Sequence, residues 1–217
     1  MRDYPDDIFT EQDEVDVDTL ANLGPLRRLA GVWEGIKGLD VNPFTDGQRR
    51  QAYVERIDLQ PIDPQSNGPQ LLYGLRYHAH ITKPGEVETY HDQVGYWLWE
   101  PATGDIFHSL TIPRGQIVLA KGNAPADADA FEVSATRGST EAGICSAPFL
   151  EHAFRTDSFR ISVTFNEDGT WSYFEDTVLQ VLGRDGPFHH TDRNTLHRVA
   201  EPKPNPLALE AQGGGEA

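Results

Sequence analysis

The sequence is poor in sulfur and in basic residues. It has one cysteine, Cys145, and one methionine in 217 residues, and 18 Lys and Arg stand against 34 Asp and Glu. A single cysteine excludes an intrachain disulfide and agrees with a reducing compartment, and we expect it to be a small buried residue rather than a nucleophile. The formal charge of −16 disfavours binding to nucleic acid or to anionic lipid surfaces.

Long apolar runs are also lacking. No stretch of about 18 apolar residues is present, and the N-terminus has neither the basic nor the apolar region of a signal peptide. These absences argue against a membrane span and against secretion, so the cytoplasm is the expected location. The chain also lacks a glycine-rich phosphate loop, a nucleophile elbow and a His-Glu-x-x-His helix, which excludes several familiar classes of enzyme.

What the sequence does contain is a regular alternation of apolar and polar residues, interrupted by turn signals such as KPGE, EPATGD and NEDGT. Ten strands are predicted, at about residues 31–39, 51–60, 70–82, 87–99, 105–112, 115–121, 129–137, 153–165, 170–182 and 188–199. A meander of this many antiparallel strands removes its exposed edges by closing on itself. We therefore predict an all-β fold, a ten-stranded antiparallel up-and-down barrel.

The segments outside the strands suggest a simple domain organisation. Residues 1–19 are acidic and weakly apolar, which is typical of a flexible tail. LANLGPLRRLAG, residues 20–31, has leucines three residues apart but is broken by Gly-Pro, so we expect a short helical cap on the barrel. Residues 201–217 are rich in Pro, Gly and Glu and are expected to be a second flexible tail, which leaves residues 20–200 as the barrel domain.

The stretch HAHITKPGEVETYH, residues 78–91, raises the question of a metal site. A cupin-like site needs two histidines one residue apart, a carboxylate and a third histidine, all inside a barrel. His78 and His80 fall on the polar face of their predicted strand, and Glu86 lies in a turn. We predict that both histidines point outward and bind no metal, whereas His91 shares a face with Trp97 and Trp99 and points inward.

The motif GVWEGIKG, with Gly31, Trp33 and Gly35, follows the predicted cap directly and resembles the signature of the nitrobindin family. The resemblance continues through QLLYGLRY, YHDQVGYWLWEP and GPFHHTDRNTLHRV and covers about residues 20–200. Proteins of this family resemble lipocalins and fatty-acid-binding proteins in architecture, so the resemblance implies the same ten-stranded barrel. The glycines would allow close approach of the backbone, and the indole would plug one end of the barrel.

The resemblance also implies a cofactor. Nitrobindins hold ferric haem b through an axial histidine on the last strand, bind nitric oxide and isomerise peroxynitrite to nitrate. Matching PF and TL in GPFHHTDRNTL places Thr191 at the axial position, with His189 and His190 just before it. Threonine is no substitute ligand; His189 shares the strand face of Thr191, and His190 lies on the other face unless a bulge turns it.

These features favour a barrel that binds a small hydrophobic molecule in a cavity lined by aromatic residues such as Trp97, Trp99 and Tyr173. One alternative is a haem b protein, which would be a peroxynitrite isomerase only with haem bound. Further alternatives are a cupin-like metal-binding barrel and a structural or protein-interaction role. The expected partner is a small hydrophobic molecule or haem. The sequence leaves the oligomeric state open, with a homodimer as one option.

Overall fold

A computed structural model describes residues 5–213, and most of them lie in β-strands. The strands are β1 (Gly31–Phe44), β2 (Gly47–Pro61), β3 (Gln65–Asn67), β4 (Gln70–Thr82), β5 (Thr89–Glu100), β6 (Asp105–Ile112), β7 (Gln116–Asn123), β8 (Ala130–Thr136), β9 (Ile144–Ser146), β10 (Phe154–Phe165), β11 (Trp171–Val181) and β12 (Phe188–Ala200). The helical segments are α1 (Thr19–Asn22), the 3-10 helix η1 (Gly24–Leu29), α2 (Pro148–Ala153) and α3 (Pro206–Gly213).

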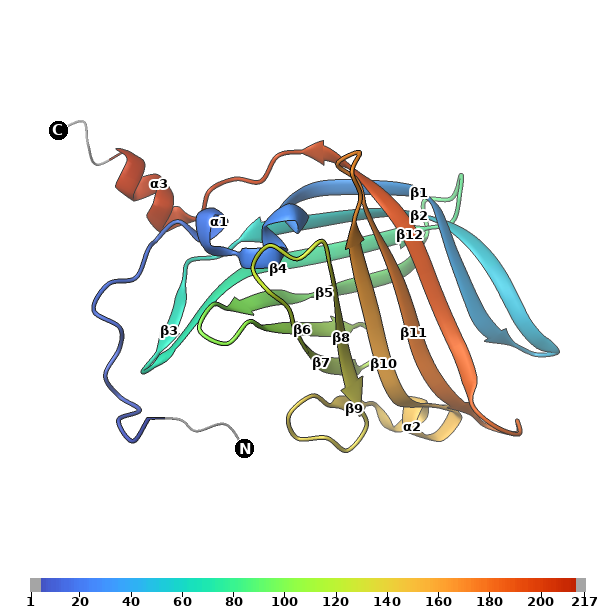
Figure 1. The fold of residues 1–217 in the computed structure, drawn as a ribbon. Helices are drawn as coiled ribbons and strands as arrows, with labels where there is room; N and C mark the ends of the chain where they lie inside the picture. The colour runs from blue at the N-terminus through green and yellow to red at the C-terminus, as the bar shows by residue number, and fades with distance from the viewer. Residues whose placement is uncertain (1–4, 214–217) are drawn as a thin grey trace.

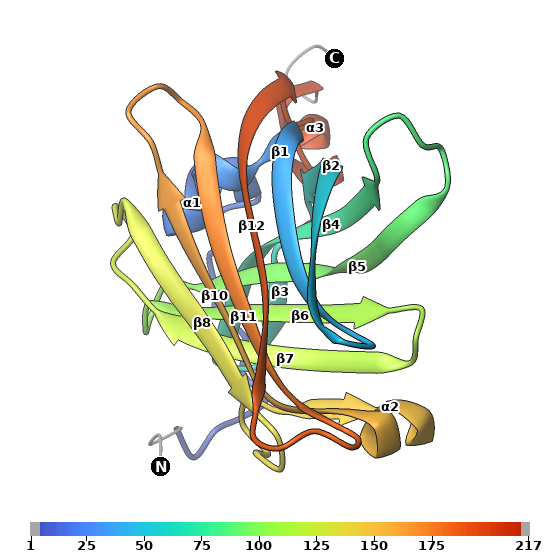
Figure 2. The same ribbon diagram turned by 90° about the vertical axis from the view of Figure 1, so that its right-hand side faces the viewer.

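The long strands form a closed antiparallel barrel. Their order is β2-β1-β12-β11-β10-β8-β7-β6-β5-β4, and β2 pairs with β4 to complete the ring. The short strands β3 and β9 pair only with β4 and β7. Figures 1 and 2 show α1 and α3 together at one end of the barrel and α2 toward the other end. The predicted ten-stranded barrel is confirmed.

The strand alternation places the core as the sequence predicted. On β10, Phe159, Ile161, Val163 and Phe165 are all buried, and on β4 the buried residues run from Tyr73 through Leu75, Tyr77 and Ala79 to Ile81. Apart from the buried Gly74, their neighbours along each strand are half-buried or exposed, because successive side chains point to opposite faces.

The predicted cap closes one end of the barrel. Leu23, Leu26 and Leu29 are fully buried, and the indole Nε1 of Trp33 donates to the Leu29 carbonyl at 2.7 Å. Gly24 has φ +52°, and a Cβ at this position would lie 2.4 Å from the ring of Trp99. The cap thus packs directly on the aromatic residues of the barrel end, as expected for a plug.

The C-terminal segment differs from the expected tail. Residues Pro206–Gly213 form helix α3, and Asn205, just before it, is 1% exposed. The Asn205 side chain bonds to Thr19 N, the Val17 carbonyl and Asp63 Oδ1 at 2.8–3.1 Å. The composition of residues 201–217 suggested a free segment, but one buried asparagine joins it to the cap. The independent mobility of the two terminal segments stays a prediction.

Two further features concern the surface. Cys145, expected to be buried, is exposed on β9. Within residues 5–213, no helix combines the length and the apolar character needed to cross a bilayer.

Candidate ligand cavity

The barrel encloses a cavity of about 410 Å³. One wall is mainly apolar and is built from β2, β4, β6, β7, β10 and α2; its members include Ile57, Ala79, Leu110, Val118, Ile161 and Leu150. The other wall, from β1, β2, β11 and β12, carries most of the acidic groups: Asp40, Glu55, Glu175 and Asp192. A cavity with one apolar wall and convergent polar groups is the usual form of a small-molecule site.

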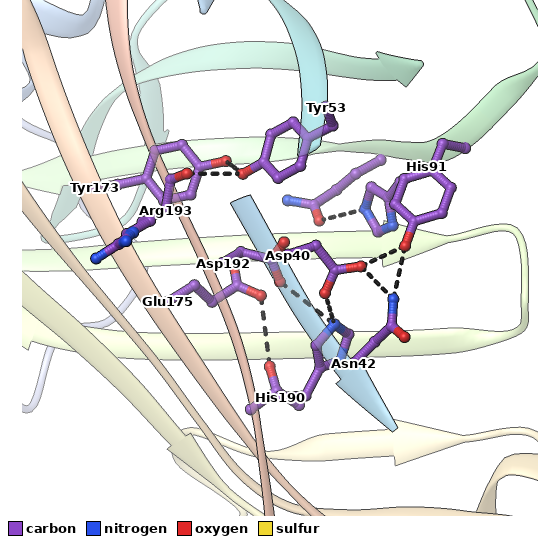
Figure 3. A network of polar contacts seen from close by, with 12 residues as sticks. Asp40, Asn42, Tyr53, His91, Tyr173, Glu175, His190, Asp192 and Arg193 are labelled. Atoms are coloured by element: carbon purple, nitrogen blue, oxygen red, sulfur yellow. Dashed lines mark hydrogen bonds and ion pairs between the residues drawn. The ribbon is translucent and has the colours of Figure 1, made fainter. Parts of the chain in front are cut away.

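Glu55 is a buried carboxyl group of this wall and is 3% exposed. Its Oε2 accepts from Tyr173 at 2.9 Å and from Asn194 Nδ2 at 3.0 Å, and the hydroxyls of Tyr173 and Tyr53 lie 2.7 Å apart. Figure 3 shows the two tyrosines end to end. Burial raises the pKa of Glu55 to about 7, although the bonds from Asn194 and Tyr173 oppose the rise.

Gly35 leaves the space in which Asn194 can hold the Glu55 carboxylate. A Cβ on Gly35 would lie 2.4 Å from Asn194 Nδ2, so only glycine leaves room for the amide that holds Glu55. Immediately after Gly35, β1 carries one extra residue relative to β2, since Gly35 pairs with Glu55 and Gly38 with Tyr53. This bulge reverses the alternation of β1 and turns Asp40 into the cavity.

Asp40 is the centre of a second group, nearer the mouth. His190 Nε2 lies 2.9 Å from Asp40 Oδ1, while Asp40 Oδ2 accepts from Tyr90 and Asn42 (Figure 3). Burial opposes ionisation of Asp40, but the bonds from His190 and Tyr90 outweigh it and lower the pKa of Asp40. Burial likewise disfavours the imidazolium, but Asp40 and Asp192 outweigh it and raise the pKa of His190, which favours an ion pair with Asp40.

Glu175 and Asp192 lie between these two groups. They are direct partners across β11 and β12, and both side chains face the cavity. Burial first, and then the charge of Glu55, raises the pKa of Glu175 to about 8. Burial and the charge of Glu175 raise the pKa of Asp192 well above its ordinary value. Each of these facing carboxyl groups therefore makes ionisation of the other less favourable.

Polar groups also lie across the cavity on β4, β5 and β6. Gln93 Nε2 donates to the Tyr77 hydroxyl at 2.6 Å, and this hydroxyl lies 2.9 Å from His108 Nε2. His108 is 1% exposed and stacks on Trp97 with ring centroids 3.8 Å apart. Burial lowers the pKa of His108 to about 3, so its ring is neutral. Among the described residues its Nδ1 has no hydrogen-bond partner.

The structure corrects the predicted axial position. Thr191 pairs with Asp176, and His189 Nδ1 lies 2.9 Å from the same Asp176, on the outer face of the barrel. His190 pairs with Thr177, and both line the cavity. Matching PF and TL selects a residue of the outer face, whereas the buried Leu196, which has the same parity as His190, gives the inward phase of β12. The inward histidine of the last strand is His190.

The other predicted site residues divide between cavity, cap and surface. His91, Trp97 and Tyr173 line the cavity, whereas Trp99 is buried beneath the cap and is not a lining residue. Gly31 and Trp33 lie at the capped end, outside the cavity lining.

The histidine pair of β4 points outward, as predicted. His78 Nε2 lies 2.9 Å from Asp92, and His80 Nε2 lies 3.0 Å from Thr89, both on the outer surface. Of the three histidines in HAHITKPGEVETYH, only His91 lines the cavity. In the described structure this stretch therefore does not bring its histidines together as a cupin-like set.

Sequence reasoning missed the acidic wall. Asp40 and His190 are 150 residues apart, and Glu175 and Asp176 are chain neighbours on a strand that point to opposite faces, so neither pair makes a local motif. The acids instead converge from different strands. The Asp40, His190 and Asp192 side chains offer ligand atoms within 4.8 Å of one another, a grouping that could hold a metal ion. An inward glutamate flanked by apolar inward residues, as in YVERIDL, is the one local signal that pointed to Glu55.

The fold and cavity define a ten-stranded barrel with an interior cavity of the kind that takes small molecules. A family model described as a THAP4-like, heme-binding beta-barrel domain matches residues 22–198, so the chain belongs to this family, and the resemblance to nitrobindins is confirmed. The crystal structure of Rv2717c from M. tuberculosis aligns with a TM-score of 0.58 and 20% identity over 84% of this chain and 99% of that chain, which shows a shared fold. No curated protein matches by sequence.

The family raises the question of whether these residues fit haem. A haem iron binds a neutral imidazole nitrogen. On β12 the inward Nε2 of His190 is engaged by Asp40, which favours the imidazolium form. The porphyrin propionates would also enter a cavity with acidic groups on its inner wall. With Nε2 held by Asp40, only Nδ1 of His190 is left for an iron, and the acidic wall disfavours a dianionic porphyrin, so haem fits this arrangement poorly.

Proposed function

We propose that residues 20–200 form a binding domain for a small amphipathic molecule other than haem. The single observation that carries the proposal is the His190–Asp40 contact of 2.9 Å, which engages the inward histidine of the last strand. The two unlike walls support it, because a ligand with one polar and one apolar end matches both.

The family's cofactor gives the second candidate. His190 favours it, because this histidine lines the cavity from the last strand, where the resemblance puts the axial ligand. With haem b held there, nitric oxide binding and peroxynitrite isomerisation would be chemistry that the cofactor supplies. Asp40 would then orient the His190 ring and raise its basicity through their hydrogen bond.

Two titrations separate the candidates. The full chain is first titrated with N-phenyl-1-naphthylamine, a neutral probe whose fluorescence rises in an apolar cavity. We expect saturable binding that is weakened by Leu110→Asp. The protein is then titrated with haemin while the Soret band is recorded.

The proposal predicts only weak haemin binding that His190→Ala does not change. A stoichiometric complex with a sharp Soret band, lost in His190→Ala, would establish the haem candidate instead. The outward His189→Ala variant is the matched control, because it removes the adjacent imidazole without altering the cavity.

A further inference from the structure

The acidic wall has too few positive partners. Glu55, Glu175 and Asp192 all face the cavity, while the histidine beside them, His190, lies 2.9 Å from Asp40 and 3.5 Å from Asp192. The other basic residues in the described lining do not neutralise the acidic wall. Arg49 and Arg114 are exposed, and burial lowers the pKa of His91. The charge that complements this wall is positive.

His108 supplies an independent indication of a ligand. Its neutral ring carries one proton, and Nε2 accepts from the Tyr77 hydroxyl, whose oxygen already receives the Gln93 amide. This order of donors assigns the proton to Nδ1, a buried N–H without a partner among the described residues. A buried donor is normally satisfied, so a ligand oxygen is the partner that this N–H calls for.

The acidic wall and the polar group of Tyr77, Gln93 and His108 lie across an aromatic interior from each other. The charges of Glu175 and Glu55 act on Tyr77 and raise its pKa further after burial, which places the acidic wall within electrostatic reach of the Tyr77–His108 group. Trp97, Phe159 and Tyr173 line the space between them. Aromatic faces favour both a flat ring and a nearby cation.

Building on the proposed function, we infer that the ligand is a small aromatic amine: its ammonium group lies at Glu175 and Asp192, and an oxygen on its far side accepts from His108. A fatty acid or another carboxylate would place like charges together. A metal ion at Asp40, His190 and Asp192 would have to break the existing His190–Asp40 bond. The other oxygen of Asp40 already accepts from Tyr90 and Asn42. An organic cation at Glu175 and Asp192 requires neither change and is the better match.

The test uses four probes of nearly equal size, measured by isothermal titration calorimetry on the full chain at pH 7. Tyramine carries the ammonium and the oxygen, phenethylamine lacks the oxygen, tyrosol replaces the ammonium by a hydroxyl, and 4-hydroxyphenylacetate carries a negative charge. We expect tyramine to bind at least about tenfold more tightly than tyrosol, equal to ~1.4 kcal/mol. Phenethylamine should fall between them, and 4-hydroxyphenylacetate should bind most weakly.

Three variants assign the preference to residues. Glu175→Gln and Asp192→Asn should each remove the advantage of tyramine over tyrosol while tyrosol binding persists. Asp176→Asn is the matched control, since Asp176 neighbours Glu175 but faces outward toward His189 and should leave the preference intact. His108→Phe, which keeps a ring against Trp97, should remove the advantage of tyramine over phenethylamine. Thermal melting confirms that each variant is folded.

Several results would overturn the inference. Equal binding of tyramine and tyrosol, tighter binding of 4-hydroxyphenylacetate, or no binding of any of the four would do so even if N-phenyl-1-naphthylamine still binds, in which case the proposed function stands. Stoichiometric Zn²⁺ binding that depends on His190 and excludes tyramine would assign a metal site instead. Loss of the naphthylamine signal together with His190-dependent haemin binding would remove both proposals.

Discussion

At the scale of the residue, Trp33 is the side chain that joins the cap to the barrel. It is 1% exposed, bonds to the Leu29 carbonyl and meets Trp171 edge to face with ring centroids 6.1 Å apart. Trp33→Ala should therefore lower the free energy of unfolding by ~3–5 kcal/mol, as large aromatic truncations in cores do. Urea unfolding measures the loss. Phe149→Ala, at a site 68% exposed, is the control and should change stability by no more than about 0.5 kcal/mol. A loss of under about 1 kcal/mol for Trp33→Ala would contradict the packing.

A second prediction at this scale concerns Thr191. Its side chain lies on the outer face, paired with Asp176 on β11 and Val41 on β1. Thr191→His should thus leave haemin affinity within about twofold of wild type, because the new imidazole projects away from the cavity. Absorption titration with haemin checks this. A tenfold or greater gain in haemin affinity would mean that the side chain of residue 191 faces the cavity in solution.

The residue scale also shows where sequence patterns suffice. On β4 and β10, one face is continuously apolar, so alternation alone gives the inward side chains. On β12 the run HHTDRN is polar on both faces, so only the apolar Leu196 farther along the strand gives the phase of His190. On β1 the bulge after Gly35 reverses the phase, which is why the inward position of Asp40 could not be read from the local pattern.

At the scale of the element, the strands and the cap were predictable and the connections less so. Turn signals and alternation define the hairpins from β4 to β7 and from β10 to β12. The β1–β2 hairpin is longer than its apolar pattern, because residues 40–50 are mostly polar yet remain paired. Helices α2 and α3 are short and weakly patterned, and their positions depend on contacts with distant segments.

One such contact makes α3 testable. The Asn205 side chain joins the segment before α3 to Thr19, Val17 and Asp63. Asn205→Ala leaves buried backbone groups without partners and should cost ~1–3 kcal/mol of unfolding free energy. Glu210→Ala, on the exposed side of α3, is the control and should be neutral. Equal stability of Asn205→Ala and wild type in urea would show that α3 is not docked in solution.

At the scale of the whole molecule, the interior acids make stability depend on pH. Glu175 keeps its proton up to a pKa of about 8 in the folded state, whereas an unfolded glutamic acid loses it near pH ~4.3. Between these values the folded state binds more protons, so stability falls as pH rises from about 5 to 8. Glu55 and Asp192, with raised pKa values, and His190, whose folded pKa is also raised, add in the same direction. His108 and His91, whose pKa values burial lowers, oppose them below about pH 6.5, whereas Asp40 is ionised in both states over this range.

The Glu175→Gln variant isolates one part of this dependence. Gln cannot ionise, so the variant should lose less stability than wild type between pH 5 and pH 8, and it should gain relative to wild type at pH 8. Melting temperatures across this range provide the measurement. Asp176→Asn, on the outer face, should keep the wild-type slope, and an unchanged slope for Glu175→Gln would mean that this carboxyl ionises normally.

The central claim is that this member of a haem-binding barrel family uses its cavity for a small molecule other than haem. Native mass spectrometry of the full chain, purified from cells supplied with excess haem precursor, tests it most directly. The account predicts that the chain appears without haem, alone or with a small basic molecule. A mass increase equal to one haem b per chain, present in wild type and in His189→Ala and absent in His190→Ala, would contradict it.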